Sequence, residues 1–332
     1  GKATTTTTVT INGGSFTYTG LEQTPATVTV TGAGGLSLTP TADYTNNTNA
    51  GTATASYAYA GDDNYLSSSD SANFTIGKAT TTTVVTINGG PFAYTGSAQT
   101  PATVTVTGAG GLSFTPTADY ANNTAVGTAT ASYTFAETAN CLSSSDSEDF
   151  TIGKAASVIT ATGISSYTYT GSAQGPASAE VIGSTGQVSY VYEGILDTTY
   201  ASSETKPTFA GTYQVIATVA EDENYTGASS EALVFTIGKA PSTITVVGDI
   251  NYVYMETAQG PDASEVTGST GNVSYTYQGI GATNYGPSTM LPTNAGTYQV
   301  VATVEADDIY SGAISDAFEF TIVKASTTIT VL

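Results

Sequence analysis

Apolar and polar side chains alternate with a period of two along much of this 332-residue chain. In the run 211–219, Tyr213, Val215, Ala217 and Val219 share one side, whereas Gln214 and Thr218 point to the other. Successive side chains of a β-strand point to opposite faces, so this run predicts a strand with one buried face. Many such short runs, separated by turns rich in glycine and asparagine, indicate an all-β protein.

The sequence repeats itself. The phrase Phe-Thr-Ile-Gly-Lys-Ala, or a close variant, recurs along the chain, and its lysine serves as a marker. The markers are spaced by 76 residues from Lys2 to Lys78 and from there to Lys154, and then by 85 residues to Lys239 and to Lys324. We therefore predict four repeats followed by the opening strand of a further one, with the bounds 1–76, 77–152, 153–237, 238–322 and 323–332.

Each repeat carries the signals of about seven short strands. Two aromatic residues spaced by two, Phe16 and Tyr18 in the first repeat, are predicted to face the core together. Glycine-rich segments predict hairpins between the middle strands at 31–35, 107–111, 183–186 and 268–271. This pattern is typical of an immunoglobulin-like sandwich. The sequence thus predicts an all-β fold, a tandem array of four immunoglobulin-like β-sandwich domains joined end to end.

No proline- or serine-rich linker separates the repeats. Phe-Thr-Ile continues through Gly-Lys-Ala into the next strand, which predicts a short hinge of about three residues and a stiff array. Residues 323–332 are either a piece of a longer array or a donor strand that pairs with a sheet edge of a neighbouring copy. The second interpretation predicts partners of the same kind, joined by strand addition.

The charge of the chain excludes several functions. The formal net charge is −21, with 27 acidic residues against six basic ones and no histidine. Such a surface repels nucleic-acid phosphates and anionic lipid headgroups, and no apolar run approaches the length of a membrane span, so we expect neither nucleic-acid binding nor membrane insertion. Catalytic triads and typical zinc sites need histidine, which leaves only carboxylate chemistry such as that of a glycosidase. Nothing in the sequence marks two carboxylates as facing each other across a cleft, so we expect no enzyme and no cofactor. An acidic, cysteine-poor composition fits an extracellular protein, at the cell surface or secreted.

Each junction holds one lysine, and two roles are open for it. An isopeptide bond to Asn or Asp would strengthen the array covalently, but it needs a buried lysine. A position at the end of a domain favours the other role, in which the lysine neutralises nearby acidic loops. The junction lysines are Lys78, Lys154, Lys239 and Lys324.

Acidic turns follow the penultimate strand of three repeats. Their carboxylates are weak candidates for Ca²⁺ ligands, because hard oxygen ligands near a hinge would stiffen it. None has the spacing of a recognised calcium loop, so solvated turn carboxylates are the favoured interpretation. The candidate residues are Asp62, Asp63, Asp222, Glu223, Asp307 and Asp308.

Tyrosines and long loops are the remaining places for a ligand. Most of the 22 Tyr fall at strand positions predicted to face inward, which favours core packing over glycan binding. The insertions that lengthen repeats 3 and 4 lie near Tyr200 and Tyr285, where a binding loop would be sought.

Several motifs resemble the bacterial surface repeats called MBG or YDG domains. They are Tyr-x-Gly-x-x-Gln-x-Pro (residues 18–25), Ala-Gly-Thr-Tyr-x-Val (210–215), Asp-x-Asn-Tyr (222–225) and the closing Phe-Thr-Ile-x-Lys-Ala. Repeats 1 and 2 depart from the family pattern with Ala53 and Ala129, where an aromatic residue is usual. The resemblance implies extracellular, immunoglobulin-like, stalk-forming modules of large secreted adhesins, and it implies no ligand.

These features predict a structural stalk or filament-forming segment of a bacterial surface protein, without catalysis. The alternative is an adhesin module that binds a glycan or a protein through the loops of repeats 3 and 4. A binding domain is expected to carry a distinctive loop set, whereas repeats 1 and 2 are nearly interchangeable, which favours the stalk.

Overall fold

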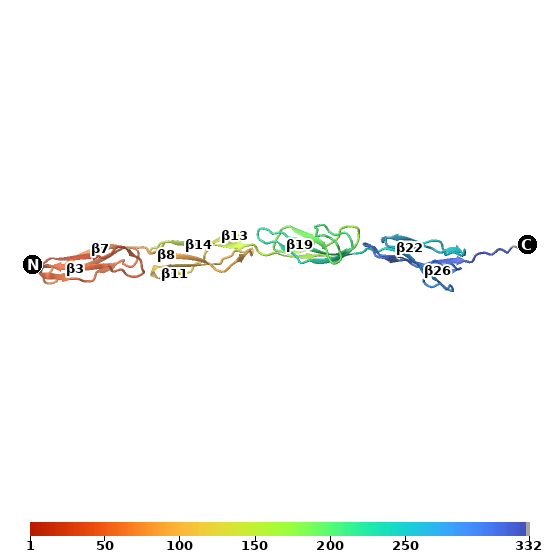
Figure 1. Ribbon diagram of the computed structural model, residues 1–332. Coiled ribbons are helices and arrows are strands. Elements are labelled where there is room, and N and C mark those ends of the chain that lie inside the picture. The colour runs from red at the N-terminus through yellow and green to blue at the C-terminus, as the bar shows by residue number, and fades with distance from the viewer. Residues whose placement is uncertain (330–332) are drawn as a thin grey trace. The chain divides into compact units, whose positions relative to one another are not determined.

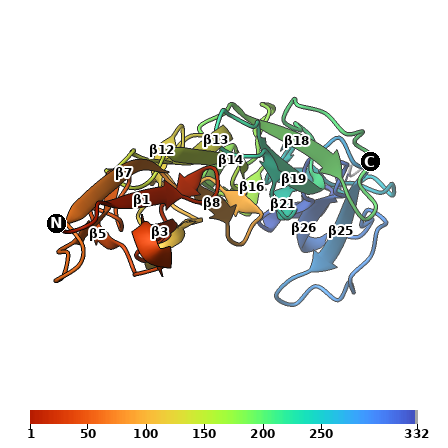
Figure 2. The same cartoon turned by 90° about the vertical axis from the view of Figure 1, so that its left-hand side faces the viewer.

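The structure is a computed structural model that describes residues 1–329, and these residues form 28 strands and no α-helix. The chain makes two compact units, Gly1–Ala155 and the residues from Ala156 onward. Figures 1 and 2 draw the strands, coloured by residue number. Each predicted repeat contributes seven strands in two sheets, so the predicted all-β sandwich fold is confirmed. Among the described residues, no helix has the length and apolar character needed to cross a bilayer. The exact repeat bounds stay predictions.

In the first repeat, a three-stranded sheet faces a four-stranded one. The smaller sheet has the order β1-β3-β4 (Thr5–Ile11, Ala26–Gly32, Leu36–Leu38), with the helical turn η1 (Ala33–Gly35) between β3 and β4. The larger sheet has the order β2-β7-β6-β5 (Phe16–Thr17, Ser68–Gly77, Gly51–Tyr59, Asp43–Thr45). β2 runs parallel to β7, and the other pairs are antiparallel.

The second repeat has the same arrangement. Its smaller sheet is β11-β10-β8 (Ser113–Phe114, Ala102–Gly108, Thr81–Ile87), with the turn η2 (Ala109–Gly111) between β10 and β11. Its larger sheet is β12-β13-β14-β9 (Asp119–Ala121, Gly127–Phe135, Ser144–Gly153, Phe92–Ala93).

The third and fourth repeats each pair a two-stranded sheet with a five-stranded one. In the third, β15-β17 (Val158–Thr162, Ser178–Ile182) faces β16-β21-β19-β18 (Ser166–Thr168, Leu233–Gly238, Gly211–Val219, Val188–Gly194), and β20 (Ala228–Ser229) pairs with β19. In the fourth, β22-β24 (Thr243–Val247, Ala263–Thr267) faces β23-β28-β26-β25 (Asn251–Val253, Phe318–Val323, Gly296–Val304, Val273–Gly279), and β27 (Ala313–Ile314) pairs with β26.

The penultimate long strand forms the centre of each core. On β19, Tyr213, Val215 and Val219 are buried, as the alternation predicts. Tyr213 stacks on Phe235 with ring centroids 5.5 Å apart. In the first repeat the corresponding residue is Ala53, and aromatic rings from β2 and β7 meet in that core. The matching pair of rings in the third repeat is Tyr167 and Phe235, so Tyr213 adds a further ring at the position where the first repeat has an alanine.

The hairpin prediction is confirmed for repeats 1 and 2 and is wrong for repeats 3 and 4. In the third repeat the segment 183–186 leads from β17 to β18, which lies in the other sheet. Hydrogen bonds direct this crossing: Ser184 donates its hydroxyl to the carbonyl of Ala220 at 2.6 Å, and the N–H of Thr185 donates to Asp222 at 2.8 Å. The segment 268–271 makes the equivalent crossing between β24 and β25.

Side chains from β7 cover the free edge of β1. The carboxylate of Asp70 accepts a hydrogen bond from the backbone N–H of Val9 at 2.7 Å. The hydroxyl of Ser68 lies 2.8 Å from that of Thr5 and 2.7 Å from that of Thr7. An edge strand presents unpaired N–H groups, and these contacts satisfy one of them without a further strand.

The C-terminal segment 323–332 begins at the last residue of β28, Val323. Residues 324–329 lie in no strand, and residues 330–332 of this predicted segment lie outside the described residues. Its role as a strand of a following repeat or as a donor strand stays a prediction.

Candidate functional site

At the junction between repeats 1 and 2, a single residue separates the part of the chain that is hydrogen-bonded to repeat 1 from the part that is hydrogen-bonded to repeat 2. The N–H of Tyr18 donates to the carbonyl of Gly77 at 2.9 Å, which attaches Gly77 to the first repeat. The N–H of Ala79 donates to the carbonyl of Asn140 at 2.9 Å, which attaches Ala79 to the second. Only Lys78 lies between them, so this hinge is shorter than the three residues predicted.

The junction between repeats 3 and 4 is built in the same way. The N–H of Tyr169 donates to the carbonyl of Gly238 at 2.8 Å, and the N–H of Ala240 donates at 2.9 Å to a carbonyl of the acidic turn in repeat 4. Lys239 alone separates the two attachments. The ring of Tyr169 also meets that of Tyr310, with centroids 5.8 Å apart, so an aromatic contact joins the two repeats.

Close packing of glycines holds the first junction together. Tyr18 packs against the hydrophobic cores of both repeats. A Cβ atom on Gly110 would lie 2.5 Å from the Tyr18 hydroxyl oxygen, and one on Gly20 would lie 2.5 Å from the Cα of Gly110. The φ angles of Gly20 and Gly110 are 81° and 70°, a region that side chains disfavour. Tyr18, which the sequence predicts to face the core of repeat 1, therefore also packs in the junction with repeat 2.

Two asparagines form a polar clasp across this junction. The Nδ2 of Asn140 donates to the Oδ1 of Asn49 at 3.1 Å. The Oδ1 of Asn140 accepts from the backbone N–H of Ala50 at 3.0 Å. Asn140 thus satisfies groups of the preceding repeat, and its own backbone carbonyl holds the start of repeat 2.

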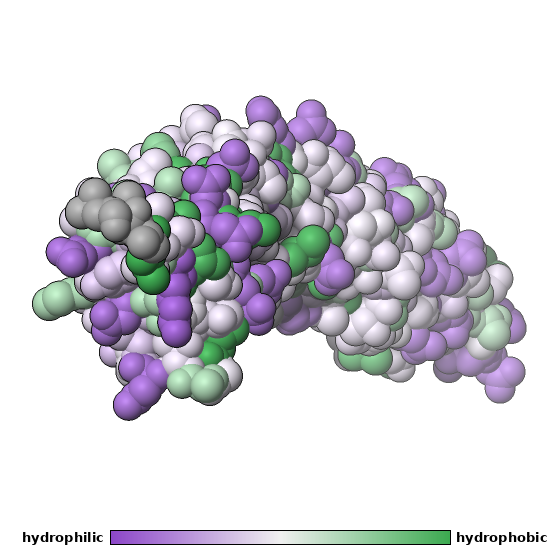
Figure 3. Space-filling model, turned by 90° about the vertical axis from the view of Figure 1, so that its right-hand side faces the viewer, coloured by the Kyte–Doolittle hydropathy of each residue, from purple (hydrophilic) through white to green (hydrophobic). Residues whose placement is uncertain are grey.

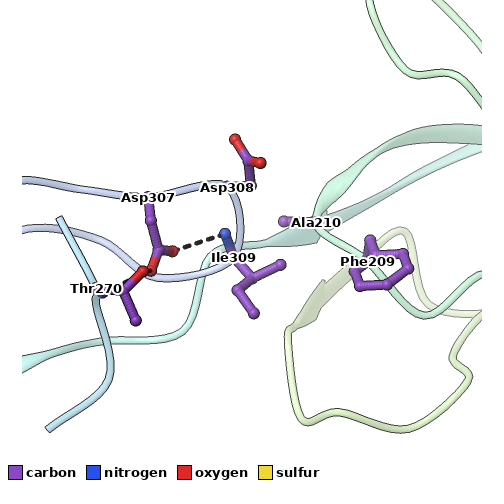
Figure 4. A pocket seen from close by; sticks show the side chains of 6 residues that line it. All are labelled: Phe209, Ala210, Thr270, Asp307, Asp308 and Ile309. Carbon is purple, nitrogen blue, oxygen red and sulfur yellow. Dashed lines mark hydrogen bonds between the residues drawn. The ribbon is translucent and has the colours of Figure 1, made fainter.

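The corresponding place between repeats 3 and 4 is open. Phe209 stands before the Ala-Gly-Thr of β19, as Asn49 stands before the Ala-Gly-Thr of β6, and Ile309 takes the place of Asn140 in the acidic turn. These residues line a pocket of about 520 Å³ (Figure 4). Its complete lining is Phe209, Ala210, Thr270, Asp307, Asp308 and Ile309.

Two junction lysines contact the turn that follows the penultimate long strand of the next repeat. Lys78 donates to the carboxylate of Glu137, and Lys239 donates to the backbone carbonyl of Asp307. Neither contact joins the lysine to an Asn or Asp side chain, so these contacts favour the neutralising role over the isopeptide bond. The remaining two lysines, half-buried and exposed respectively, are Lys154 and Lys324.

Backbone donors hold the first aspartate of the acidic turns. Asp222 accepts from the N–H groups of Thr185, Asn224 and Tyr225 at 2.8, 2.9 and 2.8 Å. These donors, Thr185 first, lower the pKa of Asp222 to about 2, because they stabilise the ionised carboxylate. Equivalent backbone donors lower the pKa of Asp62 and Asp307.

The second acidic residue of each turn is exposed to solvent. These residues are Asp63, Glu223 and Asp308. Across residues 1–329 no three His, Cys, Asp or Glu side chains gather in a way that could hold a metal ion. Ca²⁺ binding at the acidic turns stays a prediction, and the first carboxylate of each turn is already engaged by protein donors.

The tyrosines of the two long loops point into their own loops. The hydroxyl of Tyr200 donates to the carbonyl of Thr205 at 2.7 Å, and its ring meets the ring of Tyr213. Tyr285 donates to the carbonyl of Met290 at 2.6 Å in the same way. These contacts make both tyrosines structural parts of their loops.

Sequence reasoning found the junctions but not the residues that distinguish them. Asn49 and Asn140 lie 91 positions apart, and Phe209 and Ile309 lie 100 positions apart. Comparing equivalent positions of the repeats would have marked both pairs, since the turn residue is polar in repeats 1 to 3 and apolar only at Ile309.

Comparison with known families gives one match in two adjacent copies. The model of the MBG domain matches residues 157–241 and 242–326. These two segments correspond to the third and fourth predicted repeats, with each bound four residues later, and they cover more than half of the chain. Comparison with curated proteins gives no match.

Proposed function

This chain belongs to the MBG domain family, and from that premise we propose that it is an extracellular structural stalk or filament-forming segment of a bacterial surface protein. MBG domains are repeat modules of surface proteins. In this proposal the repeats keep the two ends of the segment apart and transmit mechanical force between them, and they catalyse no reaction.

The one-residue junction is the observation that supports this role most strongly. Gly77 bonds to the first repeat and Ala79 to the second, so the chain has little freedom to swing between them. A long flexible linker would instead let neighbouring domains reorient freely. Glycine packing and the asparagine clasp add contacts that a merely tethered pair of domains does not need.

The surface composition agrees with a module that stays extended in water. A net charge of −21 disfavours collapse of the repeats onto one another. On the face drawn in Figure 3, hydrophobic residues stand among hydrophilic and intermediate ones. Partners in this proposal are neighbouring copies, and strand addition through residues 323–332 is one route to them.

Electron microscopy of the full chain tests the stalk directly. Individual particles are expected to show a narrow spread of bend angles at the junction of repeats 1 and 2. Long fibres would select the filament form of the proposal. A spread of bend angles as broad as that of domains on flexible linkers would contradict it.

A second candidate function is the adhesin module. One observation favours it: the pocket at the junction of repeats 3 and 4 occupies the place where repeats 1 and 2 have a closed clasp. A stalk has no need of this opening.

A further inference from the structure

We propose that the pocket between repeats 3 and 4 binds a neutral oligosaccharide. This inference deepens the adhesin alternative and does not depend on the stalk role. The starting observation is the exchange of the clasp residues Asn49 and Asn140 for Phe209 and Ile309 at the equivalent junction. The exchange removes the hydrogen bonds that close the first junction and leaves an open hollow with an aromatic wall.

Phe209 supplies an apolar platform. Its side chain is 64% exposed, although a phenylalanine normally contributes to stability by burial. Its backbone is held in place, because the hydroxyl of Tyr213 donates to the Phe209 carbonyl at 2.8 Å. Figure 4 shows Phe209 and Ile309 on the same side of the acidic turn, with the Ile309 side chain between Phe209 and Asp307.

The acidic turn supplies a fixed polar wall. The carboxylate of Asp307 accepts from the N–H and hydroxyl of Thr270 and from the N–H groups of Ile309 and Tyr310, at 2.7 to 3.1 Å. These bonds make the turn rigid and leave Asp307 little capacity for a ligand. The neighbouring Asp308 carboxylate is exposed and accepts no hydrogen bond from the described residues, so it is free to accept from a ligand.

The hollow continues beyond Asp308. A second cavity of about 310 Å³ shares Ala210 and Asp308 with the first. Its lining adds the hydroxyl groups of Thr212 and Thr236 and the side chain of Lys239. The two cavities adjoin at Ala210 and Asp308 and together make the groove, with Phe209 in the lining of the first and Thr212, Thr236 and Lys239 in the lining of the second.

A neutral sugar chain matches this lining. A pyranose ring presents C–H groups on one face, which suit an aromatic platform, and hydroxyls around its rim, which donate to a carboxylate and accept from an ammonium or hydroxyl group. The net charge of −21 disfavours sugars that carry carboxylates. A ligand that offers a single basic side chain matches the groove less well than a sugar chain. Its ion pair with an exposed carboxylate contributes little to the binding free energy and uses only one end of the groove.

Calorimetric titration of the full chain tests the site with four neutral trisaccharides: maltotriose, mannotriose, galactotriose and chitotriose. We expect at least one to bind, and Phe209→Ala to weaken that binding by about fivefold, since an aromatic contact contributes about 1 kcal/mol. Asn49→Ala, at the equivalent position of the first junction, is expected to leave the affinity unchanged. Thermal unfolding followed by circular dichroism checks that both variants fold.

Several results would overturn the proposal. It fails if none of the four trisaccharides binds, or if binding survives Phe209→Ala unchanged. It also fails if a tri-arginine peptide binds at the groove and the saccharides do not. None of these results bears on the stiffness of the junction between repeats 1 and 2, so the stalk proposal is tested separately.

Discussion

The amide of Asn140 reaches back into the preceding repeat and donates a hydrogen bond to the Oδ1 of Asn49 at 3.1 Å. Its own Oδ1 accepts from the N–H of Ala50 at 3.0 Å, so one side chain satisfies two groups across the junction. Asn140 also accepts a hydrogen bond from the N–H of Ala79 through its backbone carbonyl, so the same residue forms the side-chain clasp and attaches the chain to repeat 2.

Replacing the clasp residue is expected to loosen the first junction. In Asn140→Ala the N–H of Ala50 loses its acceptor, so its hydrogen exchange should accelerate, and the pair of repeats should lose about 1 kcal/mol of mutual stabilisation. Hydrogen exchange read by NMR measures this. Asn64→Ala changes the equivalent residue of repeat 1 and is the matched control. Equal exchange of Ala50 in both variants would contradict a role for the clasp.

Adding one methyl group to Gly110 separates backbone strain from junction packing. Gly110→Ala places a Cβ 2.5 Å from the Tyr18 hydroxyl oxygen, and it also strains a residue with a φ of 70°. Gly34→Ala carries the same strain, with a φ of 75°, but its Cβ lies 3.5 Å from the nearest hydroxyl. We expect both variants to lose about 1 kcal/mol in chemical denaturation.

The two glycine variants should differ in the motion between repeats 1 and 2. NMR relaxation reports how each repeat tumbles. We expect the tumbling of repeats 1 and 2 to remain coupled in Gly34→Ala and to become less coupled in Gly110→Ala. If both variants keep the coupled tumbling of the unmodified chain, the packing of Tyr18 on Gly110 does not fix the junction.

The carboxylate that covers the edge of β1 is expected to stabilise the first repeat. Asp70→Ala leaves the N–H of Val9 without its acceptor, which should cost about 1 to 2 kcal/mol of unfolding free energy. Asp63→Ala removes an exposed carboxylate nearby in sequence and should have little effect. Urea denaturation of the full chain compares the two. Similar losses in both variants would point to general charge effects instead.

Acid should destabilise the third repeat through Asp222. Its folded-state pKa of about 2 lies below the ordinary value of 3.8, so the ionised carboxylate contributes stability above about pH 4 that is lost as the pH falls towards 2. We expect Asp222→Asn to show a smaller fall in Tm over this interval than the unmodified chain. Glu223→Gln serves as the control and should keep the original pH dependence; an equal fall in Asp222→Asn would refute the assignment.

Local patterns were enough to predict the strands and their buried faces. The alternation around Tyr213 and Val215 predicts a buried face because a strand exposes every second residue on the same side, whichever strand lies next to it. The recurring junction phrase likewise predicts where one repeat ends. These features depend on neighbours within a few residues.

Contacts between repeats could not be predicted from local sequence patterns. Nothing near Asn140 in the sequence indicates that its side chain meets Asn49, because the contact exists only when two folded repeats are docked. The hairpin prediction at 183–186 is wrong for a similar reason. The path of the chain there depends on hydrogen bonds from Ser184 and Thr185 to a turn about 36 residues later. The opening beside Phe209 also depends on where the next repeat lies.

The most direct test of the account is the distance distribution between repeats 1 and 2 in the full chain. Spin labels at Thr29→Cys and Thr105→Cys, two exposed positions on β3 and β10, report it by pulsed electron spin resonance, with the buried Cys141 changed to Ala. A matched protein carries Gly-Ser-Gly-Ser inserted after Lys78.

The account predicts a narrow distribution in the original junction and a clearly broader one after the insertion, because the insertion separates the attachments at Gly77 and Ala79. Distributions of equal width in the two proteins would contradict the claim that the one-residue junction fixes neighbouring repeats and makes the chain a stalk.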